Sequence, residues 1–240
     1  MIGKSFCILL FIQVALIAAQ LTESQKCMEN DSACLVRTAQ ALVPYFTAGI
    51  QELGIEPLDV MHMDKIDLDV SGLKLHVKDA TVKGLRKSVI DKIEFNMKNK
   101  ILEVAYTADV VIKGKYKASG RLLILPITGD GDYVVKLKTM KVNLMMPFNI
   151  AKNQDGKDVI ELTSYKHKSE VVGNAHFNLT NLFNGNKETS DALLTFMNQN
   201  WKQLQNEFSS PTFKRPNEII YLAIKKYLLS QPKENLFLRH

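Results

Sequence analysis

Between about residues 60 and 183 the sequence alternates between apolar and polar residues, and this alternation limits the folds available to the chain. Ile66, Leu68 and Val70 alternate with aspartates, and a longer series runs from Leu102 to Ile112. A period of two indicates antiparallel strands with one buried face and one solvated face. Because several such segments follow one another, we expect an antiparallel sheet to form most of the molecule.

Turn-forming residues separate these segments. They lie at Lys83-Gly84, Lys98–Lys100, Gly129–Asp132 and Asn153–Gly156. We interpret Gly129–Asp132 as a tight hairpin turn, because a calcium loop would need further carboxylates and a terminal Glu.

Helical spacing precedes and follows the strands. A short amphipathic helix is predicted from Ser32 onward, with Asp31 or Ser32 as its N-cap and a kink or early stop at Pro44. A second apolar stripe starts at Leu193, is interrupted by Ser209–Pro211 and Pro216, and then resumes. Read as one kinked element, residues 188–229 would be about 60 Å long. This order predicts an α+β fold in which an antiparallel sheet packs on helices.

Residues 1–19 have the features of a secretory signal peptide, which leaves residues 20–240 as one domain. Lys4 supplies the positive charge, and the apolar run from Phe6 to Ile17 is followed by small residues. This run of about 12 residues is shorter than the ~20 that a spanning helix needs, so a membrane anchor is the less favoured alternative. We therefore expect a secreted, extracellular protein without stable membrane insertion.

Two cysteines, Cys27 and Cys34, remain after the signal peptide. An even number in an oxidising compartment predicts a disulfide, which here would form a local cross-link near the N-terminus. A zinc site is disfavoured because no neighbouring Cys or His completes four ligands. Asn30 and Asn178 begin glycosylation sequons, which are consistent with secretion but also common by chance.

Catalytic motifs are missing from the sequence. The five His residues are isolated, and there is no nucleophile elbow, zinc-protease motif or phosphate-binding loop. We therefore expect no enzyme, no metal and no cofactor. The formal net charge of +6 comes from lysines spread along solvated strand faces, which argues against a nucleic-acid partner. Abundant Met and Phe side chains suit either a core or a lipid cavity.

Several segments together resemble the insect takeout and haemolymph juvenile-hormone-binding protein family. The resemblance covers essentially the whole mature chain and is carried by Cys27 with Cys34, Gln51–Asp59, Gly129–Gly131, Asn181–Asn186, Phe196–Trp201 and Pro232–Phe237. It implies a tubular lipid-binding fold, in which a strongly curved antiparallel sheet wraps a long C-terminal helix and encloses an elongated apolar cavity. It also implies that the short N-terminal helix is a lid at one cavity mouth. Moth hormone carriers have a second disulfide, whereas this chain has no cysteine after Cys34, so it is closer to the takeout branch.

The function that this resemblance implies is carriage of a juvenile-hormone-like terpenoid, a fatty acid or another small hydrophobic ligand. The implied ligand-binding residues are Leu42, Tyr45, Phe46, Ile50, Tyr133, Phe148, Met197, Trp201, Ile220, Tyr221 and Ile224. Tyr45, Tyr133 and Tyr221 are the candidates for polar contacts with a ligand. The alternative is an extracellular signalling or interaction protein in feeding, chemosensory or circadian regulation, with a structural cavity and an unidentified receptor. In either case we expect a monomer.

Overall fold

Strands form most of the molecule. The computed structural model describes residues 26–238, so the predicted signal peptide at residues 1–19 lies outside the described residues. Seven strands pair antiparallel within this range, as the alternating pattern predicts: β1 (Met61–Val70), β2 (Leu73–Lys83), β3 (Val89–Asn96), β4 (Ile101–Leu122), β5 (Leu125–Lys152), β6 (Asp158–Leu162) and β7 (Lys166–Leu179). The α+β fold class predicted from the sequence is confirmed.

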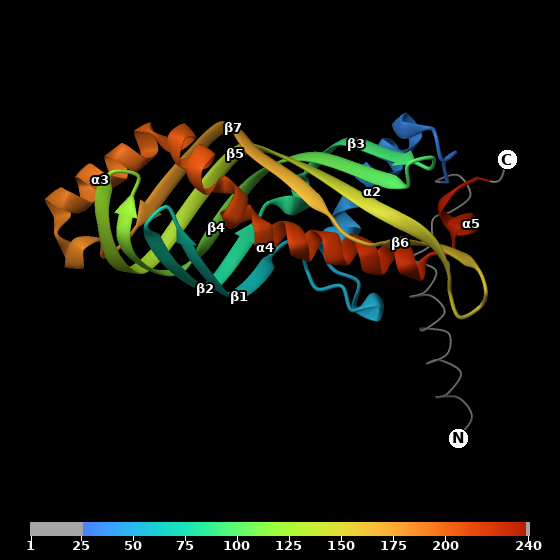
Figure 1. The fold of residues 1–240 in the computed structure, drawn as a ribbon, viewed down its shortest axis with the longest axis horizontal. Coiled ribbons are helices and arrows are strands. Elements are labelled where there is room, and N and C mark those ends of the chain that lie inside the picture. The colour runs from blue at the N-terminus through green and yellow to red at the C-terminus, as the bar shows by residue number, and fades with distance from the viewer. Residues whose placement is uncertain (1–25, 239–240) are drawn as a thin grey trace, which may run out of the picture.

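The β4–β5 hairpin runs along the whole sheet (Figure 1). Its ladder extends from the pair Leu122 and Leu125 at the tip to the pair Ile101 and Pro147. On one side, β4 pairs with β2 and β3; on the other, β5 pairs with β7 and β6. The register shifts between Ala108 and Val110, and similar shifts occur in three other ladders. Because such irregularities bend strands and increase their twist, the sheet curls.

Helices cover the concave side and the two ends of the sheet. They are α2 (Ser32–Thr47), α3 (Lys187–Gln199), α4 (Trp201–Ser230) and the short α5 (Lys233–Leu236). Helix α4 contacts β1 at one edge of the sheet and β6 and β7 at the other. It therefore closes the curled sheet into a tube. Helix α3 covers one end, whereas α2 and α5 lie at the other (Figure 1).

Prolines are accommodated inside the helices. Helix α2 starts at its predicted N-cap, where the Asp31 carboxylate accepts a hydrogen bond from the Cys34 N–H at 2.9 Å, and it runs through Pro44 to Thr47. Pro211 and Pro216 interrupt the apolar stripe but not the helix, because both residues lie inside α4. The long helical region is broken instead at Asn200, between α3 and α4. Packing of α4 against both sheet edges outweighs the proline penalty.

The predicted turn at Gly129–Asp132 is also wrong, since these residues lie within β5 and the chain reverses at Leu123 and Ile124. The two glycines have a packing role. A Cβ atom at Gly129 would lie 2.5 Å from the Tyr116 hydroxyl, and one at Gly131 would lie 2.6 Å from the Thr180 carbonyl. Glycine inside a strand commonly marks such a close approach.

The predicted disulfide between Cys27 and Cys34 is confirmed. It fastens the start of α2 to the preceding segment, which also contacts the C-terminal end of the chain. The Leu238 N–H donates to the Cys27 carbonyl at 3.0 Å, and Cys27 and Phe237 form a parallel bridge. The two ends of the described chain are therefore joined beside α2.

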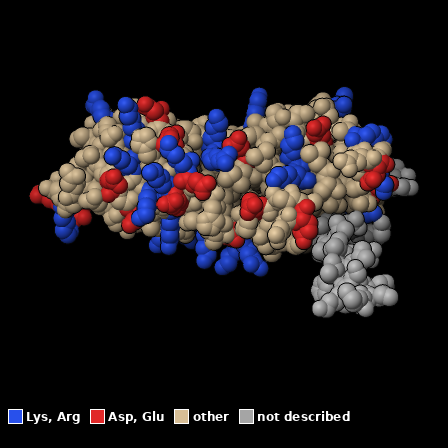
Figure 2. Space-filling model, turned by 90° about the horizontal axis from the view of Figure 1, so that it is seen from below, with Lys and Arg blue, Asp and Glu red and all other residues tan. Residues whose placement is uncertain are grey.

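Charged side chains of both signs are mixed along the surface. Figure 2 shows acidic and basic groups side by side over the face that it displays. Several lysines on the solvated strand faces form ion pairs, such as Lys115 with Asp132 and Lys138 with Asp109. Exposed pairs of this kind contribute little stability, about 0–1 kcal/mol each.

The packing role of Gly129 can be tested by a double-mutant cycle. We expect Gly129→Ala to lower the free energy of unfolding by about 1–3 kcal/mol, because the new methyl group overlaps the Tyr116 hydroxyl. Removing that hydroxyl in a Tyr116→Phe background should reduce the cost of the alanine. Urea unfolding of the four proteins measures the coupling. An equal cost of Gly129→Ala in both backgrounds would contradict the explanation.

Candidate ligand-binding cavities

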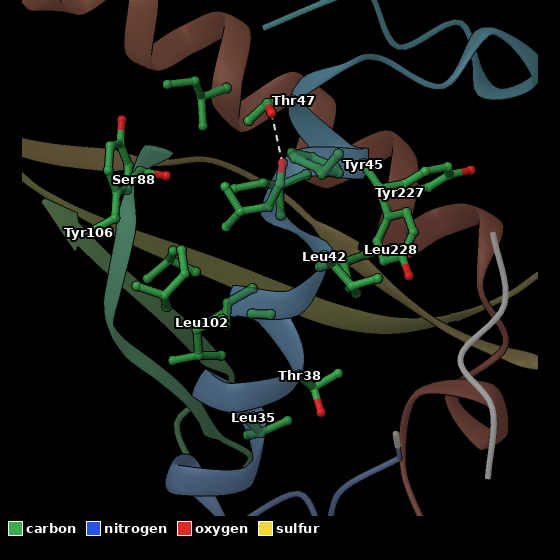
Figure 3. A pocket seen from close by; sticks show the side chains of 18 of the residues that line it. Leu35, Thr38, Leu42, Tyr45, Thr47, Ser88, Leu102, Tyr106, Tyr227 and Leu228 are labelled. Atoms are coloured by element: carbon green, nitrogen blue, oxygen red, sulfur yellow. Dashed lines mark hydrogen bonds between the residues drawn. The ribbon is translucent and has the colours of Figure 1, made fainter. Parts of the chain in front are cut away.

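A first apolar cavity lies at the α2 end of the molecule and has a volume of about 220 Å³. A single water needs only about 10–15 Å³ of such space, so the cavity is far larger than a packing defect. Helix α2 forms one wall, β3 and β4 form the opposite wall, and α4 and α5 complete it (Figure 3). The lining side chains include Leu35, Ala39, Leu42, Val43, Phe46, Ile93, Leu102, Val104, Ile220, Ile224, Leu228, Leu236 and Phe237.

Two hydroxyl groups on the strand side of this first cavity have no hydrogen-bond partner among residues 26–238, those of Tyr106 and Ser88. Burial raises the pKa of Tyr106, so its hydroxyl stays protonated at physiological pH. By contrast, the Thr47 hydroxyl donates to the Val43 carbonyl at 2.7 Å (Figure 3). Tyr106 and Ser88 are therefore the groups best placed to bind an oxygen atom of a ligand.

A second apolar cavity of about 230 Å³ lies toward the α3 end. Its walls come from the inner faces of β1, β2, β4, β5 and β7 and from α3 and the first half of α4. The lining residues include Met63, Leu73, Leu75, Val77, Tyr116, Ala118, Leu122, Ile127, Tyr133, Ala175, Phe177, Met197, Trp201, Leu204, Phe208 and Phe213. No residue lines both cavities, and no charged side chain lines either of them.

Two tyrosines in the second cavity differ in how their hydroxyls are satisfied. The Tyr116 hydroxyl donates to the Thr180 carbonyl at 2.8 Å. The Tyr133 hydroxyl has no partner in the part of the chain that the structure describes. Burial raises the pKa of each to about 12, so both remain protonated donors. Tyr133 is thus one polar group of this cavity that is available to a ligand.

A buried polar cluster on α4 lies between the helix segments that line the two cavities. Asn217 is 1% exposed, and its Nδ2 contacts His167 Nδ1 at 3.2 Å, Ser169 Oγ at 2.9 Å and the Phe213 carbonyl at 2.8 Å. Its Oδ1 atom has no partner among the described residues. Leaving a buried oxygen unpaired costs about 1–3 kcal/mol. The segment between the cavities is therefore polar, unlike either cavity.

Eight of the eleven residues predicted to bind ligand line a cavity in the structure. Leu42, Tyr45, Phe46, Ile220 and Ile224 line the first cavity, and Tyr133, Met197 and Trp201 line the second.

Three predicted residues line neither cavity. Ile50 is 2% exposed and bridges to Ile55, and Phe148 is 2% exposed and packs edge-on against Phe95. The Tyr221 hydroxyl donates to the Leu162 carbonyl at 3.4 Å, and its ring stacks on Tyr165. The structure thus places these three side chains in the packed core.

Sequence reasoning missed Tyr106 and Ser88 of the first cavity. Tyr106 belongs to the alternating series from Leu102 to Ile112, so its inward direction could have been read from the period of two. Ser88 follows a short 3₁₀ turn, Leu85–Lys87, and no periodicity marks it. Asn30 and Asn178, which begin the two sequons, are both exposed in the structure. Their glycosylation stays a prediction.

Two further findings concern metal binding and membrane crossing. Within residues 26–238, no group of three or more His, Cys, Asp and Glu side chains is arranged to hold a metal ion. Over the same range, no helix combines the length and the apolar character needed to cross a membrane.

A curled antiparallel sheet closed by a long helix around apolar space defines the class of tubular lipid-binding proteins. Within this class, the chain belongs to the haemolymph juvenile hormone binding protein family, whose model matches residues 6–238. This confirms the resemblance seen in the sequence, and the family is one of binding proteins.

Three known proteins show the similarity in detail. The crystal structure of Takeout 1 from Epiphyas postvittana matches with a TM-score of 0.87 and 41% identity, covering 90% of this chain and 100% of that one. The circadian clock-controlled protein daywake of Drosophila melanogaster is 29% identical over 192 residues, which are 75% of this chain and 74% of the relative. Daywake of Drosophila yakuba is 28% identical over the same length.

The buried contact of His167 predicts a pH dependence of stability. Burial lowers the pKa of His167 below its ordinary value, and its Nδ1 faces a donor, the Asn217 amide. The folded state therefore favours neutral imidazole, and this contribution is present above about pH 6.5 and is lost as the pH falls through the lowered pKa.

Replacing His167 with Gln keeps an acceptor but removes the titration. We expect the free energy of unfolding to fall less between pH 7 and pH 5 in His167→Gln than in the unmodified protein. Urea unfolding at both pH values measures this difference, and His62→Gln, at an exposed position of β1, is the control. Identical pH dependence in the unmodified protein and His167→Gln would contradict the assignment.

Proposed function

We propose that this protein is a secreted, monomeric carrier that binds a small apolar ligand in its internal cavities. The observation that carries the proposal is the pair of cavities between the sheet and the helices, both lined almost entirely by apolar side chains. Membership in a family of juvenile hormone binding proteins supports the same function. The disulfide between Cys27 and Cys34 suits an extracellular protein.

Binding in such a site requires only burial. A ligand that loses about 400 Å² of apolar surface to the cavity gains up to ~10 kcal/mol at about 25 cal/mol per Å². Loss of translational and rotational freedom and ordering of side chains remove several kcal/mol of that gain. Affinities from micromolar to nanomolar follow.

The lining chemistry favours a neutral ligand. No Lys, Arg or His side chain lines either cavity, so an ionised carboxylate inside would lack a counter-charge, which is costly in an apolar site. Hydroxyl groups are available at Tyr106 and Ser88 in the first cavity and at Tyr133 in the second. A terpenoid alcohol, ester or ketone fits this pattern better than an ionised fatty acid.

Filling each cavity separately tests the function and locates the ligand. Ala39 lines the first cavity and Ala175 the second, so Ala39→Phe and Ala175→Phe place a ring where a ligand would lie. We expect binding of a neutral fluorescent probe, such as a fluorescent terpenoid, to weaken at least tenfold in one or both variants. Native mass spectrometry of gently purified protein should show a bound lipid that the affected variant lacks.

Matched controls come from the neighbouring outward positions. Ala41 is exposed on the same helix as Ala39, and His176 is exposed on the same strand as Ala175. Ala41→Phe and His176→Phe should bind the probe as the unmodified protein does. If the unmodified protein carries no lipid and binds no probe, the cavities are structural only and the carrier function is refuted.

Removal of the Tyr106 hydroxyl tests how the ligand is oriented. We expect Tyr106→Phe to weaken binding of a terpenoid alcohol or ester about 3–15-fold, as loss of one neutral hydrogen bond of about 1 ± 0.5 kcal/mol predicts. A pure hydrocarbon of the same length should bind equally well to both proteins, because it makes no hydrogen bond. Titration calorimetry with the two ligands measures the difference. An equal loss for both ligands would show that the ring itself, and not the hydroxyl, is what matters.

A further inference from the structure

The tip of the β4–β5 hairpin has an unusual composition for a solvent-exposed turn. Leu122 pairs with Leu125, so the chain reverses through only two residues, Leu123 and Ile124. Two-residue hairpin turns strongly favour Gly, Asn and Asp, because they require left-handed backbone angles. Leu123 nevertheless has a φ of 55°, which is disfavoured for a bulky side chain.

The side chain of Ile124 projects into solvent. It is 74% exposed, more than any other large apolar side chain among the described residues. Leu123 and Leu125 beside it are half-buried and pack against the cluster around the second cavity. A polar Asn-Gly turn would be both less strained and more soluble. Compared with such a turn, the observed tip is less stable and less soluble, and it exposes an apolar side chain at the surface.

The position of the tip links it to the second cavity. The hairpin ends beside α3, at the end of the molecule opposite α2 and α5 (Figure 1). Leu122 and Ile127, on the two strands behind the tip, both line the second cavity. The exposed Arg121 directly precedes the tip, and its N–H donates to the Gly72 carbonyl of the β1–β2 turn at 3.0 Å. A basic side chain thus lies just behind the apolar one.

We propose that this tip, Leu123 to Leu125, is a contact site for a phospholipid bilayer, into which Ile124 inserts reversibly. A hairpin tip one side chain wide offers much less area than the ~800 Å² per partner of a stable protein interface, so a second copy or a receptor fits it poorly. A fluid lipid layer surrounds a narrow apolar tip on all sides. Arg121 then lies at the depth of the phosphate groups, as basic side chains do at membrane interfaces.

The carboxylates nearest the tip in the same two hairpins do not oppose this contact. Asp69 pairs across the ladder with Lys74, and Asp130 pairs with Lys117. Each negative charge is therefore matched by a lysine in the ladder. Glu207 accepts a hydrogen bond from Ser71 in the adjoining turn. The contact goes beyond carriage in a cavity, because it needs no bound ligand and gives a carrier a place to exchange one with a membrane.

An environment-sensitive fluorophore tests the insertion directly. Cys27 and Cys34 are paired, so a single new thiol in the mature protein can be labelled with a nitrobenzoxadiazole group. We expect the fluorescence emission of the label in Ile124→Cys to shift to shorter wavelength and to increase in intensity when phosphatidylcholine vesicles are added. Val89→Cys is the matched control, since Val89 is also an exposed β-branched residue, 56% exposed, and lies on β3 beside α2. Its label should not respond.

Co-flotation with the same vesicles gives a second readout on unlabelled protein. Replacing Ile124 by Asn removes the exposed apolar side chain and leaves the half-buried Leu123 in its packing contact, so the I124N variant should fold about as stably as the unmodified chain. We expect its vesicle partition to fall about tenfold or more, as loss of one aliphatic side chain from an apolar phase predicts.

Three results would overturn the contact site. The first is no response at position 124, and the second is an equal response at positions 124 and 89, which means non-specific adsorption. The third is a response without vesicles that grows with protein concentration, which means self-association. Probe binding in the cavities is measured separately. A protein that binds vesicles through the tip but carries no lipid would leave this contact standing and remove the carrier function.

Discussion

The dry face of one strongly curled sheet is the constraint on which the rest of the structure depends. Strands β4 and β5, of 22 and 28 residues, alternate inward apolar and outward polar side chains over most of their length. An apolar face of this extent must be removed from water, and no second sheet is present in residues 26–238 to cover it. Helix α4 is the main cover, and one helix only about 10 Å wide does not fill a curled sheet. The unfilled space becomes the two cavities.

Helical side chains also protect an exposed sheet edge. Asn198 forms two hydrogen bonds with the backbone of Phe177 in β7, accepting from its N–H at 2.7 Å and donating to its carbonyl at 3.0 Å. The Gln205 side chain accepts from the Val171 N–H in the same strand. These amides take the place of a neighbouring strand, and an edge satisfied in this way is not available for pairing with another chain. The helices therefore stabilise the tube through polar contacts as well as apolar ones.

The features that sequence could predict are those with a regular period. Alternation located the sheet, and helical spacing located α2, α3 and α4. The errors arose where tertiary contacts outweigh local preference. Glycine favours turns, whereas Gly129 lies within β5 and lets Tyr116 approach the strand. Proline is disfavoured inside helices, whereas packing of α4 on both sheet edges keeps the helix intact at Pro211.

The candidate site was predicted less completely than the fold, for a related reason. Period tells which side chains point inward, but it does not tell which inward side chains touch one another and which face empty space. Phe148 and Trp201 are both apolar and both directed inward, yet Phe148 packs against Phe95 and Trp201 lines a cavity. That difference depends on how strongly the sheet curves at its register shifts, and the alternating pattern does not give the degree of curvature.

The polar atoms inside the tube then determine which ligands the cavities can distinguish from one another. Apolar walls alone discriminate weakly, since one methylene changes binding by only about 1–3 kcal/mol. Each cavity has a hydroxyl group without a protein partner, Tyr106 in one and Tyr133 in the other, and the Asn217 cluster lies on the helix between them. For a carrier of the kind proposed here, selectivity follows from where a ligand's oxygen atoms fall along the tube. A ligand whose oxygen meets neither hydroxyl would leave that oxygen buried and unpaired, which costs more than a misplaced methylene.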